Sequence, residues 1–246
     1  MMSRGRARGR RLALENARFA ISFTPRRWSA LARFGRAWLG RDAATGEAVE
    51  RLALPGFAAA ELAALTAEPA RYGWHATLKP PFRLAAGATP GELVAYAMAF
   101  AAARLPFEIP ALELGSLGGC LALVPSAVPP LLAGLAEDCV RVFDLFRATS
   151  GGAELVPQAN TRLPPRQRTH PRHWGYPYVM DEFRFHMTLT TRLAAEEQAR
   201  VKAALAPRIE PLLGRALAVD AVSIFVEPGP GEAFRELRRF AFEAAG

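Results

Sequence analysis

One stretch of the chain alternates apolar and polar side chains with a period of two, which is the pattern of a half-buried strand. The residues that would face a core are Phe183, Phe185, Met187 and Leu189. The residues that would share the opposite face are Arg184, His186, Thr188 and Thr190. An earlier stretch has the same design, with Trp74, Ala76 and Leu78 opposed to Gly73, His75, Thr77 and Lys79. The pattern predicts two amphipathic strands that each present a histidine, a threonine two residues later and a cation.

The other apolar residues predict further strands and several helices. Strands are expected at 18–23, 107–117, 120–124, 217–226 and 234–242, with a hairpin closed at Gly118-Gly119. Helices are expected after an N-cap at Thr24, at 57–68, from the capping box at Thr89 to 104, and at 194–206. A further long helix would bury the stripe Leu131, Leu132, Leu135, Cys139, Val142, Phe143 and Phe146. Strands and helices interleave in two similar halves, which predicts the α+β class.

Composition places the chain among ordinary globular proteins. It has 246 residues, of which 51% are hydrophobic and 22% charged, and 246 residues are ample for a well-buried core. No apolar run approaches the roughly 20 residues of a membrane span, and no apolar segment of a secretory signal follows the basic start. The two cysteines, Cys120 and Cys139, make neither a disulfide framework nor a metal-ligand spacing. A cytoplasmic protein that acts away from membranes is expected.

The net charge of +8 is concentrated at the start of the chain. Without the arginines Arg4, Arg6, Arg8, Arg10 and Arg11 the net charge is +3. Residues 1–12 are therefore expected to form a disordered basic arm. Such an arm can also bind phosphates of RNA, so RNA stays open as a partner.

The repeated His-x-Thr-Leu pattern, at His75 and at His186, has a direct chemical meaning. An imidazole with an ordinary pKa near 6.5 can take or give a proton near neutral pH. The threonine two residues later points the same way and can donate a hydrogen bond to a phosphate oxygen. One copy alone would be a weak signal. Two copies in matching strand context predict a general base, a general acid and two donors at one phosphate, without a metal.

These motifs resemble the 2H phosphoesterase superfamily, and more closely its DUF1045 branch of phosphonate metabolism proteins. The resemblance is carried by four segments: 71–82, 119–125, 174–178 and 182–190. It implies a bilobal, pseudo-symmetric fold in which two antiparallel sheets with outer helices surround a central cleft, as a single domain over residues 13–246. A Lys79-Pro80-Pro81 sequence departs from the apolar strand that many members of the superfamily keep.

The resemblance further implies a metal-independent enzyme, without a cofactor, that hydrolyses a cyclic phosphodiester, for which a cyclic phosphate of a phosphorylated ribose is a reasonable substrate. His75, His186, Thr77 and Thr188 would be catalytic, but the symmetric motifs do not say which histidine is the base. Residues expected to bind substrate are Lys79, Arg184, Tyr72, Tyr176 and Tyr178. The protein is expected to be a monomer.

Four alternatives stay open at this point. The chain could process RNA with 2′,3′-cyclic ends or 2′-5′ linkages, or it could bind a phosphorylated ligand without turnover. The loop at 150–178, with Arg162, Arg166, Arg168 and Arg172, could close over an anion. His170 and His173 could ligate a metal, although a solvated basic loop is the preferred interpretation because no third ligand has a telling spacing.

Overall fold

The computed structural model describes residues 16–149 and 173–243. The predicted basic arm, His170 and the four loop arginines therefore lie outside the described residues. Among the residues that the structure does describe, no helix has the length and apolar character needed to cross a membrane.

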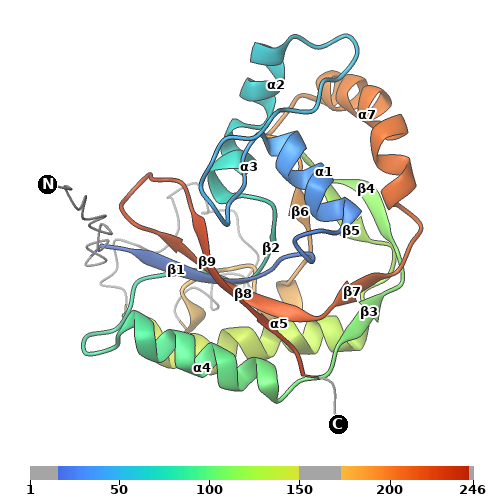
Figure 1. Ribbon diagram of the computed structural model, residues 1–246. Helices are drawn as coiled ribbons and strands as arrows, with labels where there is room; N and C mark the ends of the chain where they lie inside the picture. The colour runs from blue at the N-terminus through green and yellow to red at the C-terminus, as the bar shows by residue number, and fades with distance from the viewer. Residues whose placement is uncertain (1–15, 150–172, 244–246) are drawn as a thin grey trace, which may run out of the picture.

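A four-stranded antiparallel sheet forms one half of the molecule. Its strand order is β2 (Ala76–Phe82), β1 (Arg18–Phe23), β8 (Ala221–Glu227) and β9 (Arg235–Ala241). Helices α4 (Pro90–Ala102) and α5 (Pro130–Val142) cover one face of this sheet (Figure 1). The first motif therefore lies on an edge strand, because β2 has only β1 beside it.

A three-stranded antiparallel sheet carries the second motif. Its order is β4 (Leu112–Leu117), β5 (Cys120–Pro125) and β6 (Met187–Thr188), so the second motif also lies at an edge. The predicted hairpin turn is present at Gly118 and Gly119, whose φ angles of 59° and 89° suit glycine. A small pair of strands, β3 (Phe107–Ile109) and β7 (Leu217–Val219), stands beside the two larger sheets.

The remaining helices lie around the three-stranded sheet and the motif strands (Figure 1). They are α1 (Ala30–Leu39), α2 (Ala59–Leu65), α3 (Ala67–Tyr72) and α7 (Ala195–Ile209). Short 3-10 turns are η1 (Phe143–Phe146), η3 (Met180–Glu182) and η4 (Glu210–Leu212).

Several predicted element boundaries are wrong. Ser29, not Thr24, caps α1, because the Ser29 hydroxyl accepts the amide of Ala32. The helix expected at 57–68 is two helices, α2 and α3, and α3 continues through Pro69. Leu131, which was placed on the core face of its helix, is 64% exposed. By contrast, the capping box at Thr89 and Glu92 is present as predicted.

One large hydrophobic core joins the two halves. The buried cluster contains Ala76 and Leu78 of the first motif together with Phe185, Met187 and Leu189 of the second. The Trp38 indole on α1 donates to the carbonyl of Leu189 at 2.8 Å, which ties α1 to the second motif. The predicted α+β class, with antiparallel sheets and outer helices, is confirmed.

The pairing of β2 with β1 contains an irregularity that changes the direction of one predicted site residue. Ser22 pairs with Thr77, but Ile21 pairs with Lys79, so Leu78 is an extra residue on β2. A bulge of this kind turns the following side chains to the opposite face of the sheet. Thr77 faces away from the core, whereas Leu78 and Lys79 are both turned toward the helices and are 1% exposed.

Candidate active site

The imidazole of His75 is held by its own backbone. Its Nδ1 lies 2.9 Å from the carbonyl oxygen of Gly73, two residues earlier. Because a carbonyl oxygen only accepts, Nδ1 carries the hydrogen and donates it. The other ring nitrogen, Nε2, lies 3.0 Å from the Thr77 hydroxyl. In the neutral ring Nε2 is an acceptor, so the hydroxyl donates to it.

His186 is anchored in the same way. Its Nδ1 lies 2.7 Å from the carbonyl oxygen of Arg184, again two residues earlier, and donates to it. This leaves Nε2 of His186 as the nitrogen that is available for chemistry. The same i−2 anchor fixes both rings in the same tautomer, although their sequence contexts differ.

The two histidines belong to one electrostatic environment. Burial lowers the pKa of His75 to about 4, and the nearby His186 also lowers it. The hydrogen bond from Nδ1 to the Gly73 carbonyl acts in the opposite direction and raises this pKa. Tyr72 and Phe225 lie beside the ring of His75, with ring centroids 6.4 and 5.3 Å away. His75 is therefore neutral at neutral pH, and the electron pair on its Nε2 accepts the hydrogen bond from the Thr77 hydroxyl.

The two threonines lie on the polar sides of their strands, as their motifs predict. Thr77 pairs with Ser22 across β1, and Thr188 pairs with Ala122 across β5. Both are half-buried. Thr190 does not continue the polar face, because it is fully buried and its hydroxyl accepts the amide of Leu121 at 3.0 Å.

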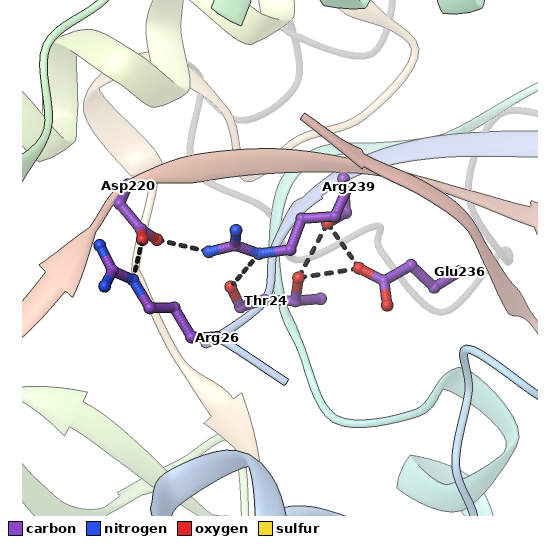
Figure 2. A network of polar contacts seen from close by, with 6 residues as sticks. Thr24, Arg26, Asp220, Glu236 and Arg239 are labelled. Atoms are coloured by element: carbon purple, nitrogen blue, oxygen red, sulfur yellow. Dashed lines mark hydrogen bonds and ion pairs between the residues drawn. The ribbon is translucent and has the colours of Figure 1, made fainter. Parts of the chain in front are cut away.

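A polar network supports the strand beside His75, and the sequence interpretation missed it (Figure 2). Thr24 follows Phe23, the partner of Ala76, so it lies next to His75 across the strand pair. The hydroxyls of Thr24 and Ser223 lie 2.8 Å apart, and each is within 2.9 Å of the Glu236 carboxylate.

Two arginines extend this network toward the surface. Arg239 donates from Nε to the carbonyl of Thr24 at 3.4 Å, and Arg239 and Arg26 both form ion pairs with Asp220 (Figure 2). Thr24 before Pro25 suggested a helix cap, and no local signal connected it with residues two hundred positions away. The network rigidifies the end of β1 against which His75 lies.

Lys79 does not share a face with His75 and Thr77. After the bulge it enters the helix layer, where its ammonium lies 3.0 Å from the carbonyl of Val140 and 3.0 Å from the Asp144 carboxylate. Burial lowers its pKa, while Asp144 acts in the opposite direction. The expectation that Lys79 follows the polar alternation is wrong, because strict period-two counting fails at a bulge.

The other predicted contact residues lie around the first motif or at the surface. Tyr72 stacks on Phe234 and borders His75. Tyr176 and Tyr178 are partly exposed, with their rings 5.7 Å apart. Arg184 is exposed, and its carbonyl, rather than its guanidinium, has the defined contact in the site.

Within the described residues, no group of three or more His, Cys, Asp or Glu side chains is placed to hold a metal. His173 is exposed. Its suggested partner, His170, lies outside the part of the chain that the structure describes.

Comparison with known proteins places the chain in a family. A family model described as "Protein of unknown function (DUF1045)" matches residues 77–235. A protein of Janthinobacterium sp. (strain Marseille) named "Ribose 1,5-bisphosphate phosphokinase PhnN" is 37% identical over 242 residues, which cover 93% of this chain and 51% of the relative. A protein of the same name from Laribacter hongkongensis is 36% identical, over 90% of this chain and 51% of its own. The chain thus spans about half the length of the curated relatives it matches.

Solved structures with a related arrangement include E. coli LigT complexed with ATP, with a TM-score of 0.41 and 12% identity over 94% of this chain and 99% of that one. A structure described as a phosphoesterase gives a TM-score of 0.39 and 13% identity over 94% and 100%.

The fold and site define an α+β protein with two His-x-Thr motifs on edge strands of separate antiparallel sheets. The chain belongs to the DUF1045 family, the branch that its sequence motifs predicted.

Proposed function

We propose that the chain is a metal-independent phosphoesterase that hydrolyses a cyclic phosphodiester of a phosphorylated ribose. The observation that carries this proposal is the matched anchoring of His75 and His186. Each ring donates from Nδ1 to the carbonyl two residues earlier, so Nε2 is the nitrogen that can transfer a proton, in His75 once the Thr77 hydroxyl has left it.

The unequal surroundings of the two rings suggest their roles. His75 is neutral because burial lowers its pKa to about 4, so it acts as the general base. It takes a proton from water on Nε2 as the water oxygen bonds to phosphorus. His186 in its protonated form donates from Nε2 to the ribose oxygen as the bond between that oxygen and phosphorus breaks. The proton count balances, because one proton enters through His75 and one leaves through His186.

Thr77 has two successive partners in this mechanism. In the free protein its hydroxyl donates to Nε2 of His75 and so occupies the base. A phosphate oxygen of the substrate competes for this hydroxyl, and its arrival frees Nε2 for the attacking water. Thr77 and Thr188 then stabilise charge on the phosphate oxygens in the transition state.

The names of the relatives support the ligand class. Ribose 1,5-bisphosphate is a phosphorylated ribose, which is the class of compound proposed here. The phosphokinase activity in those names is not part of the proposal. The commonest phosphate-binding motif of nucleotide-dependent phosphotransferases needs Gly-Lys followed by Ser or Thr. The two lysines of this chain, Lys79 and Lys202, follow Leu78 and Val201.

A hydrolysis panel tests the proposal. The substrates are a ribose 1,2-cyclic phosphate that carries a 5-phosphate, 2′,3′-cyclic nucleotides and RNA with a cyclic end, each with and without chelator. Turnover of the ribose compound that persists in chelator is expected. Turnover of cyclic-ended RNA alone would move the assignment to RNA processing, and turnover of none of them would leave a binding protein.

A further inference from the structure

A pocket of about 330 Å³ lies at the end of the four-stranded sheet, away from the two histidines. Its walls include Arg18 at the start of β1, Lys79 on β2, Arg147 and Ala148 after η1, and Tyr176. Neither His75 nor Thr77 lines it. The backbone at 147–148 is fixed there, because it pairs with the chain that follows β2.

The charges behind one wall of this pocket do not cancel. Asp144 accepts from Lys79 at 3.0 Å and from Nε and Nη2 of Arg147 at 2.7 and 3.1 Å. The Arg147 side chain is 14% exposed and that of Lys79 2%. Among the described residues, one carboxylate thus serves two largely buried cations, which leaves an excess positive charge where the dielectric screening is weak.

Arg147 also has a donor to spare. Its Nε and Nη2 are used by Asp144 and by the carbonyl of His173. Among the described residues, its Nη1 makes no hydrogen bond. On the opposite side of the pocket, Glu227 pairs with Arg18 and Arg71, so the second carboxylate near the pocket is also shared between two cations.

The pocket adjoins the catalytic strand. Lys79 is two residues beyond Thr77, which is about 7 Å along an extended chain. Tyr176 lines the pocket. Burial raises the pKa of Tyr176, and Tyr178 and Tyr72 also raise it, so Tyr72 lies near Tyr176. Tyr72 in turn borders His75.

We propose that this pocket binds a phosphate monoester, a second phosphate on the substrate that is held but not cleaved. Its place in catalysis rests on the proposed function, because the pocket would orient a phosphorylated ribose whose cyclic phosphate reaches His75 and His186. Arg147 binds the phosphate directly through Nη1, and Lys79 supplies buried positive charge beneath it.

Calorimetric titration of the 246-residue chain with ribose 5-phosphate, and with ribose as the control, tests this site. Ribose 5-phosphate has no cyclic diester, so its binding does not depend on whether the chain hydrolyses anything. The variants are Arg147→Gln and the pair Ala148→Glu and Ala148→Gln. The Ala148 pair differs only in charge on the half-buried pocket wall. Arg200→Gln is the control, because Arg200 pairs with Glu61 at another surface.

Ribose 5-phosphate is expected to bind the parent chain, and ribose is not. Arg147→Gln and Ala148→Glu should weaken binding about tenfold or more, the effect of losing or opposing one charged hydrogen bond. Ala148→Gln and Arg200→Gln should stay within about twofold of the parent. Thermal melts identify a variant that fails to fold. If Arg147→Gln fails to fold, the comparison of Ala148→Glu with Ala148→Gln still tests the site.

Two results would overturn the proposal. One is absence of ribose 5-phosphate binding to the parent at millimolar concentration. The other is binding that Thr77→Val abolishes and that Ala148→Glu leaves unchanged, because the phosphate would then occupy the catalytic motifs.

Discussion

At the scale of single residues, His75 is the side chain whose surroundings say most about the chemistry. It is half-buried between Tyr72 and Phe225, and burial keeps it neutral. The sequence predicted that His75 and His186 act together but left base and acid open, because the motifs are identical. The proposed role of His75 as the base rests on its burial, and one of the rings beside it, Phe225, is distant in the sequence.

The lowered pKa of His75 predicts how kcat/KM depends on pH on the acid side. The base must be neutral, so kcat/KM should not decline as pH falls through the ordinary histidine range near 6.5. It should decline only as pH approaches about 4, where His75 becomes protonated. Initial rates at low substrate concentration between pH 3.5 and 8 measure this limb. A decline centred near 6.5 would contradict the assignment of His75 as the base.

Substitutions at Thr77 can distinguish the contribution of its hydroxyl to the rate from the contribution of its branched shape. Thr77→Val keeps the branched side chain and removes the donor, so kcat should fall about 10² to 10³-fold, as for a single oxyanion donor. Thr77→Ser keeps a hydroxyl and serves as the matched control, with a much smaller loss expected. Equal losses in Val and Ser variants would show that the hydroxyl is not the functional group.

At the scale of elements, alternation predicted the core faces of both motifs. It predicted a longer second strand than β6 (Met187–Thr188), and it could not predict a bulge. Ser22 pairs with Thr77 and Ile21 with Lys79, so one extra residue reversed the direction of Lys79. The helix layer then had a partner ready in Asp144. The prediction of Thr24 as a helix cap failed because its hydrogen-bond partners are distant in sequence. Ser223 and Glu236 lie on strands from the far end of the chain.

The packing of helix α1 against Trp74 is expected to affect both stability and the first motif. A Cβ on Gly35 would lie 2.1 Å from the Trp74 indole, the residue before His75. Gly35→Ala would gain about 1 kcal/mol of helix propensity but must displace a buried ring, and overpacking of this kind costs about 1–3 kcal/mol. With a gap this short, the clash should dominate. We expect lower stability in urea titration and reduced kcat.

Gly134 on α5 is the matched control for this substitution. A Cβ there meets no atom within 4 Å. Gly134→Ala should therefore stabilise the chain by about 0.5–1 kcal/mol and leave kcat unchanged. If both alanine variants shift the free energy of unfolding in the same direction, the close contact between α1 and Trp74 does not determine the effect of Gly35→Ala.

At the scale of the whole molecule, the sequence predicted the α+β class and the family, because patterning and motifs are properties of the entire chain. The motif strands belong to separate sheets, yet their apolar faces enter one shared core. The single-domain extent of 13–246, the cytoplasmic location and the monomeric state remain predictions.

The most direct test of the central claim compares the two histidines on the ribose cyclic phosphate substrate in the presence of EDTA. We expect the parent enzyme to turn over in chelator. His75→Ala and His186→Ala should each lose about 10² to 10⁴-fold in kcat and keep their melting behaviour, because each ring transfers one proton. Full activity in either single variant, or loss of parent activity in EDTA that a divalent ion restores, would contradict a paired, metal-independent acid–base mechanism.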